Sequence, residues 1–132
     1  MAPVSRRETF TATLAAFHAE VSRLAGCPTA SEGTFYPLLA DLLVELSEGL
    51  GTPVDALPLP RLGGDLCPDL QIVTRAGGVV GYVEVKPPGS NLRTILRTRQ
   101  IARYRAAFPN LLLTDCRTSY LLRGTEEKPW FE

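Results

Sequence analysis

The chain contains few cysteines, one histidine and no surplus of either charge. Its three cysteines, Cys27, Cys67 and Cys116, are odd in number, widely separated and not spaced like zinc ligands. This usage argues against a disulfide framework and is typical of a reduced, cytoplasmic setting. His18, the only histidine, lies one residue from the apolar stripe of an expected helix, so we expect it to be structural.

Long apolar runs are also absent. No run approaches the length of a membrane span, and the opening residues MAPVSRRETF lack the apolar core of a secretion signal, so we expect a cytoplasmic protein without a membrane partner. The 132 residues suit one globular domain. Basic and acidic residues, 14 of each, give a net charge of zero, which argues mildly against a free-standing nucleic-acid binder.

The charge is nevertheless unevenly distributed. Between Pro87 and Thr114 there is no acidic residue, while five arginines occur there: Arg93, Arg97, Arg99, Arg103 and Arg105. On one expected helix, Arg93, Arg97, Gln100 and Tyr104 would form a stripe about 60° wide. This stripe could bind DNA by following a phosphate backbone, or it could be an ordinary solvated face.

Helical and strand patterns predict an α/β domain in the order ααββαββ. The first helix follows a capping-box pattern at Ser5, and a proline- and glycine-rich loop is expected over 52–67. The expected elements are helices over about 5–25, 34–48 and 91–107 and strands over 70–74, 79–86, 110–114 and 119–123. We expect residues 1–125 to form the domain and 126–132 to form a C-terminal tail or the start of a linker to a missing domain.

The strands over 70–74 and 79–86 are separated by the sequence RAGG, which predicts a β-hairpin. With a two-residue turn at 76–77 or 77–78, Asp69 falls opposite Glu84 or Lys86, about 5 Å away on the same face. A three-residue turn or a β-bulge would break this register. The hairpin therefore offers a point where two carboxylates and an ammonium group can meet.

Two interpretations of this point are open. Facing carboxylates repel one another without a cation, and clustered carboxylates are what a divalent ion needs in order to bind a phosphate and lower the pKa of bound water. Alternatively, Glu84 and Lys86 are the wet side of a strand whose Val83 and Val85 face the core. Strand alternation does not distinguish the two.

Four motifs resemble those of the PD-(D/E)xK nuclease superfamily. Pro68-Asp69, followed by Glu84-Val85-Lys86, resembles its two-part signature. The run SEGTFYP at 31–37 resembles the helix-borne glutamate element of the family, and Gln100-Ile101-Ala102-Arg103-Tyr104 resembles its Gln-x-x-x-Tyr helix. The motifs occur in the family order and cover the chain from about Ser31 to Arg123.

The resemblance implies a restriction-endonuclease-like core, with a central mixed β-sheet of about four strands flanked by helices. It also implies a bound Mg²⁺, for which Mn²⁺ can substitute. Asp69, Glu84 and the carbonyl of Val85 would bind the ion. Lys86 would orient or help deprotonate the attacking water and stabilise charge on the phosphate.

Two further residues receive roles from the resemblance. Gln100 would act near the metal and the water. Glu32 would be another ligand, either direct or through water, although a glutamate beside a helix N-terminus is also favourable without any metal.

Within the superfamily, the chain looks most like the nuclease domain that precedes an N6-adenine DNA methyltransferase in type IIG restriction-modification enzymes. No methyltransferase motif is present in the 132 residues, so a methyltransferase or specificity domain would act in cis or in trans. We expect a Mg²⁺-dependent DNA endonuclease of a restriction-modification or defence system. The alternative is a catalytically inactive nuclease-like module that binds DNA or a protein.

Overall fold

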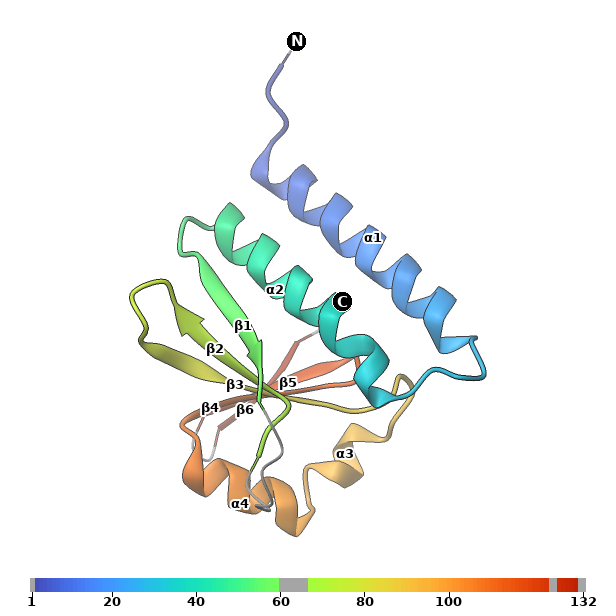
Figure 1. The fold of residues 1–132 in the computed structure, drawn as a ribbon, viewed down its shortest axis with the longest axis vertical. Helices are drawn as coiled ribbons and strands as arrows, with labels where there is room; N and C mark the ends of the chain where they lie inside the picture. The colour runs from blue at the N-terminus through green and yellow to red at the C-terminus, as the bar shows by residue number, and fades with distance from the viewer. Residues whose placement is uncertain (1, 60–66, 124–125, 131–132) are drawn as a thin grey trace.

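A six-stranded mixed β-sheet lies between two layers of helices (Figure 1). The structure is a computed structural model and describes residues 2–59, 67–123 and 126–130. The strands lie side by side in chain order, and only β3 and β4 are parallel. Their bounds are β1 Val54–Pro58, β2 Leu70–Thr74, β3 Val79–Val85, β4 Asn110–Thr114, β5 Ser119–Arg123 and β6 Glu126–Trp130.

The first helical layer consists of α1 (Arg6–Ala25) and α2 (Tyr36–Gly49), joined through the 3₁₀ turn η1 (Glu32–Phe35). The capping box is confirmed: the Ser5 hydroxyl accepts from the Glu8 N–H at 3.2 Å, and the Ser5 N–H donates to the Glu8 carboxylate at 2.8 Å. α2 carries Pro37 in its first turn, where a missing N–H leaves no helical bond unmade. None of the described helices is long and apolar enough to cross a membrane.

The second layer, α3 (Leu92–Ile95) and α4 (Arg99–Ala107), connects the parallel strands β3 and β4. The prediction of a single helix over 91–107 is wrong. The backbone of Thr98 is extended, and its hydroxyl accepts a hydrogen bond from the Ile101 N–H, so a new helix starts after Thr98. Where the parallel pair begins, Gly81 is required: a Cβ there would stand 2.8 Å from the Asn110 carbonyl oxygen.

The β2–β3 hairpin departs from the expected turn in two ways. Thr74 and Gly78 close a three-residue turn, with Gly77 at φ 96°, and β3 carries a β-bulge next to Val79. Either feature alone would shift the pairing by one residue and place Asp69 and Glu84 on opposite faces. Together they cancel, and Leu70 pairs with Val83, so Asp69 comes to lie beside Glu84 as expected.

The sheet is covered on both faces. One core lies between the sheet and α1–α2 and includes Val83 and Val85. The other lies between the sheet and α3–α4 and includes Leu111, Leu113 and Tyr104. Glu84, which is 1% exposed, is therefore not on a wet side of its strand; that interpretation is wrong because helices cover the second face as well.

The sheet has six strands rather than about four. β1 occupies part of the segment expected to be a loop and pairs with β2 along its whole length. β6 occupies residues 126–130 of the expected tail and pairs with β5; residues 131–132 lie outside the described residues. Both are edge strands containing a proline, Pro58 and Pro129, which the ladder of an edge strand tolerates. Pairing with a neighbour, rather than local propensity, makes them strands.

Candidate active site

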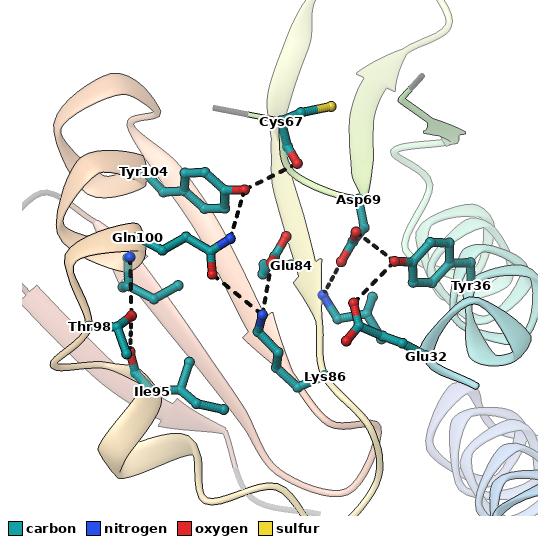
Figure 2. A network of polar contacts seen from close by, with 12 residues as sticks. Glu32, Tyr36, Cys67, Asp69, Glu84, Lys86, Ile95, Thr98, Gln100 and Tyr104 are labelled. Atoms are coloured by element: carbon teal, nitrogen blue, oxygen red, sulfur yellow. Dashed lines mark hydrogen bonds and ion pairs between the residues drawn. The ribbon is translucent and has the colours of Figure 1, made fainter. Parts of the chain in front are cut away.

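Two buried carboxylates meet where β2 begins and β3 ends (Figure 2). Asp69 is 3% exposed, and its N–H donates to the Val83 carbonyl at 3.0 Å. Its Oδ2 accepts from the Val85 N–H at 2.7 Å, so Asp69 is held against the end of β3. The hairpin thus brings Asp69 and Glu84, which are 15 residues apart in sequence, to one point of the sheet.

Glu84 is placed in an environment that disfavours its charge. Burial raises the pKa of Glu84 to about 7, the negative charge of Asp69 raises it as well, and Lys86 opposes the shift. One of its oxygens, Oε1, is buried and has no hydrogen-bond partner among the described residues. A buried carboxylate oxygen without a donor, next to a second carboxylate, fits a site for a hard cation.

The backbone of Val85 contributes to the same point. Since the N–H and C=O of one residue in a strand point to the same side, and the Val85 N–H reaches Asp69, the Val85 carbonyl is directed to the Asp69 side as well. Among the described residues, no three Asp, Glu, His or Cys side chains are grouped so that they could hold an ion. Two carboxylates and one carbonyl match Mg²⁺, which keeps several waters.

Lys86 lies beside these carboxylates and is held from two directions. Its Nζ is 3.1 Å from Glu84 Oε2, and its side chain is 18% exposed. Nζ also donates to Gln100 Oε1 at 3.5 Å, and the backbone N–H of Lys86 donates to the Thr114 carbonyl at 2.8 Å. The ammonium group is therefore presented at the rim of the carboxylate pair.

Gln100 and Tyr104 extend this network along α4. Gln100 Nε2 donates to the Tyr104 hydroxyl at 3.4 Å, and that hydroxyl donates to the Cys67 carbonyl at 3.1 Å (Figure 2). Tyr104 is 2% exposed, so the expectation that it contacts DNA is corrected: its hydroxyl ties α4 to the chain just before Asp69. Spacing alone placed it on a polar stripe, because a residue four positions after Gln100 lies on the same helical face whether that face is exposed or covered.

The arginines of the expected stripe lie on separate segments. Arg93 is in α3, and Arg97 follows it in the turn before α4. Both are exposed, as Gln100 is, but the break at Thr98 removes the common helical face assumed from the sequence. Their assignment to DNA binding stays a prediction.

Glu32 approaches the carboxylate pair through Tyr36, a residue to which the sequence assigned no role. The Tyr36 hydroxyl donates to Asp69 Oδ1 at 2.6 Å and lies 3.3 Å from Glu32 Oε1 (Figure 2). A signal was present in the sequence: residues four apart at a helix start lie on one face, and Glu32 and Tyr36 have this spacing.

Comparison with known proteins shows the fold. No protein-family model matches the chain, and no curated protein matches its sequence. Among solved structures, a chain of the cryo-EM structure of a DrdV–DNA complex is similar, with a TM-score of 0.65 and 19% sequence identity over 87% of this chain and 81% of that chain. At this identity the likeness concerns the fold alone, and it confirms a restriction-endonuclease-like α/β core.

Proposed function

We propose that this domain is a Mg²⁺-dependent endonuclease that hydrolyses phosphodiester bonds in DNA, as part of a restriction-modification or defence system. One observation carries the proposal: buried Asp69 and Glu84 meet at the end of a hairpin, with the Lys86 ammonium group 3.1 Å from Glu84. Two carboxylates and a lysine at one point supply the groups that metal-assisted phosphodiester hydrolysis requires.

In this proposal Asp69, Glu84 and the Val85 carbonyl hold the ion. When bound, Mg²⁺ (or Mn²⁺) supplies Lewis acidity toward the phosphate and makes a bound water more acidic. Asp69 is oriented for this by the Val85 N–H, and Glu84 Oε1 has no other partner among the described residues. The cation would also offset the burial and the Asp69 charge that together raise the pKa of Glu84.

Lys86 acts on the water and the phosphate. Its ammonium group is positioned by Glu84 and Gln100. It can orient the attacking water or stabilise the negative charge that develops on the phosphate oxygens. A point charge on a flexible stem suits this role. Gln100 is a positioning residue, because it accepts a hydrogen bond from Lys86 and donates one to Tyr104.

Several observations support DNA as the substrate. The similar solved chain belongs to a protein bound to DNA. In this chain, Arg93, Arg97 and Arg99 are exposed and lie in α3, in the turn before α4 and at the start of α4, the helix that carries Gln100. These arginines contact phosphates rather than bases, so sequence specificity comes from a methyltransferase or specificity domain, in cis or in trans.

A second candidate function is a nuclease-like module that binds DNA or a protein without cutting. The net charge of zero favours it, because a free-standing DNA-cutting domain usually has a basic surplus. The two functions differ in one measurable property, which is turnover of DNA.

The test is a cleavage assay on duplex DNA in Mg²⁺ and in Mn²⁺, run in parallel with binding measurements. We expect weak, poorly specific cleavage by the wild type and its loss in Lys86→Ala, with DNA affinity changed little because Lys86 acts in the transition state.

Arg75→Ala is the matched control, since it also removes one positive charge but lies in the hairpin turn, paired with Glu48. It should cleave like the wild type. If the wild type binds DNA tightly but cleaves it in neither metal, the endonuclease proposal is wrong and the function is that of a non-cutting binding module.

A further inference from the structure

We propose that Tyr36 is a positioning residue for the metal site: its hydroxyl fixes the Asp69 carboxylate and keeps Glu32 out of the first coordination sphere. The inference rests on the proposed function and extends it to a residue outside the motif carboxylates. It is drawn from the contacts of one hydroxyl group with Asp69 and Glu32.

The first step concerns the orientation of Asp69. Oδ1 accepts from the Tyr36 hydroxyl at 2.6 Å, and Oδ2 accepts from the Val85 N–H at 2.7 Å. One donor stands at the start of α2 and the other at the end of β3, so the two donors fix the plane of the carboxylate from two directions. Each carboxylate oxygen has two lone pairs, so a donor on one of them does not prevent the same oxygen from binding a cation.

The second step concerns the single hydrogen of the hydroxyl. It can serve only one acceptor fully, and the 2.6 Å contact with Asp69 is much shorter than the 3.3 Å contact with Glu32. The hydrogen therefore belongs to Asp69. Tyr36 stands between the two carboxylates, which agrees with the absence of a three-carboxylate group among the described residues. Glu32 would therefore reach a bound ion only through water.

The third step separates this role from packing. The Tyr36 ring is half-buried and packs against the core on the α2 side, and phenylalanine preserves that ring. Tyr36→Phe therefore removes the hydroxyl and little else. Loss of a hydrogen bond that orients a metal ligand typically weakens metal affinity about 10- to 100-fold.

The experiment is calorimetric titration of the full chain with Mn²⁺ and with Mg²⁺. We expect Tyr36→Phe to bind at least about tenfold more weakly than the wild type. Tyr82→Phe is the matched control: its hydroxyl also has a side-chain partner, Gln71 Nε2 at 3.3 Å, and its ring packs on Phe108. Its metal affinity should equal that of the wild type.

A second variant tests the hydrogen assignment independently. Glu32→Gln should weaken metal binding less than about threefold, because Glu32 lies beyond the first sphere. A loss as large as that in Tyr36→Phe would overturn the inference, since Tyr36 would then act through Glu32. Saturating Mn²⁺ should restore most of the cleavage by Tyr36→Phe, because its defect is one of affinity.

The outcomes distinguish this inference from the proposed function. If the wild type binds neither ion, the metal site fails, and the role of Tyr36 fails with it. If the wild type binds and Tyr36→Phe binds equally well, only the role of Tyr36 is overturned, and the endonuclease proposal stands.

Discussion

Glu84 lies in surroundings that disfavour its charged form. It is buried beside Asp69, its Oε1 lacks a partner among the described residues, and only Lys86 opposes the rise of its pKa. A fold does not gain stability from such a group in the absence of a cation. The stability of the metal-free protein should therefore respond to pH through Glu84.

Glu84→Gln is expected to gain stability relative to the wild type as the pH rises. The folded pKa of about 7 exceeds the ordinary value of 4.5, so between these values the folded state binds more protons than the unfolded chain. The free energy of unfolding of the wild type therefore falls as the pH rises through this window, whereas glutamine does not titrate. The difference between the two proteins should change by roughly 3 kcal/mol.

Urea unfolding in EDTA at several values between pH 4.5 and 8 measures this change. Glu48→Gln, at the exposed end of α2, is the control and should show no comparable trend. A difference between Glu84→Gln and the wild type that stays constant with pH would contradict the raised pKa of Glu84.

Mg²⁺ or Mn²⁺ is expected to raise the melting temperature of the wild type and to have no effect on that of Asp69→Ala or Glu84→Ala. An ion that binds only the folded state stabilises it by about 2.7 kcal/mol at a hundred times its Kd. Glu84→Ala relieves the repulsion between the two facing carboxylates, which should preserve or improve stability without metal. Asp69→Ala relieves it too but leaves the Val85 N–H without its acceptor, so it should lose stability without metal. Thermal unfolding followed by circular dichroism measures both effects.

Asp55→Ala is the control for the metal response, because Asp55 lies in β1 and pairs with Arg75 instead of with the site. It should respond to the ions like the wild type. An unchanged response in both site variants would remove Asp69 and Glu84 as ligands.

At the scale of elements, the β4–β5 turn supports the loop that follows Lys86. The buried Asp115 carboxylate accepts from the N–H groups of Arg117 at 3.0 Å and Thr118 at 2.7 Å within its own turn. Its other oxygen accepts from the Gly89 N–H at 2.9 Å, which joins the turn to the segment after β3. One side chain thus connects the carboxyl end of β3 to the β4–β5 turn.

Asp115→Ala is expected to destabilise the protein by about 2–4 kcal/mol, because three backbone N–H groups lose their acceptor and buried donors without partners are costly. Denaturant unfolding measures the loss. Asp41→Ala removes an exposed carboxylate from α2 and should cost less than about 0.5 kcal/mol. Equal losses of unfolding free energy in the two variants would show that Asp115 does not stabilise the turn.

At the scale of the whole molecule, a neutral chain carries its exposed arginines unevenly. The acid-free stretch between β3 and the end of β4 contains five arginines, four of them exposed, and α3 and α4 form the helical layer that faces Glu84 and Lys86. α1 lies in the other layer, packed against α2 (Figure 1). Phosphate contacts are therefore expected on one side of the molecule.

DNA affinity is expected to fall steeply with salt, and Arg93→Ala or Arg97→Ala should each reduce the slope of log K against log [salt] by about 1. Arg6→Ala, at the start of α1, should leave the slope unchanged. Binding isotherms on duplex DNA over a salt series measure the slopes. A slope equally sensitive to Arg6→Ala would mean that DNA contacts are not confined to the α3–α4 layer.

The sequence by itself determined most of the local structure and the site carboxylates. The Ser5 capping box, the β2–β3 hairpin and the strands over 110–114 and 119–123 formed as expected, because capping groups, turn residues and short apolar runs act over a few neighbours. The pairing of Asp69 with Glu84 was also anticipated, although through a two-residue turn, whereas the chain uses a three-residue turn and a compensating bulge.

Only the tertiary structure decided what covers and connects these elements. β1 and β6 are strands because they form hydrogen bonds with the edges of β2 and β5. Their own sequences show no strand pattern that would predict this pairing. Glu84 is buried because α3 and α4 cover its face, and Tyr36 meets Asp69 across 33 residues of sequence. Burial and long-range contacts depend on how layers pack, so alternation along one strand cannot distinguish a wet face from an enclosed site.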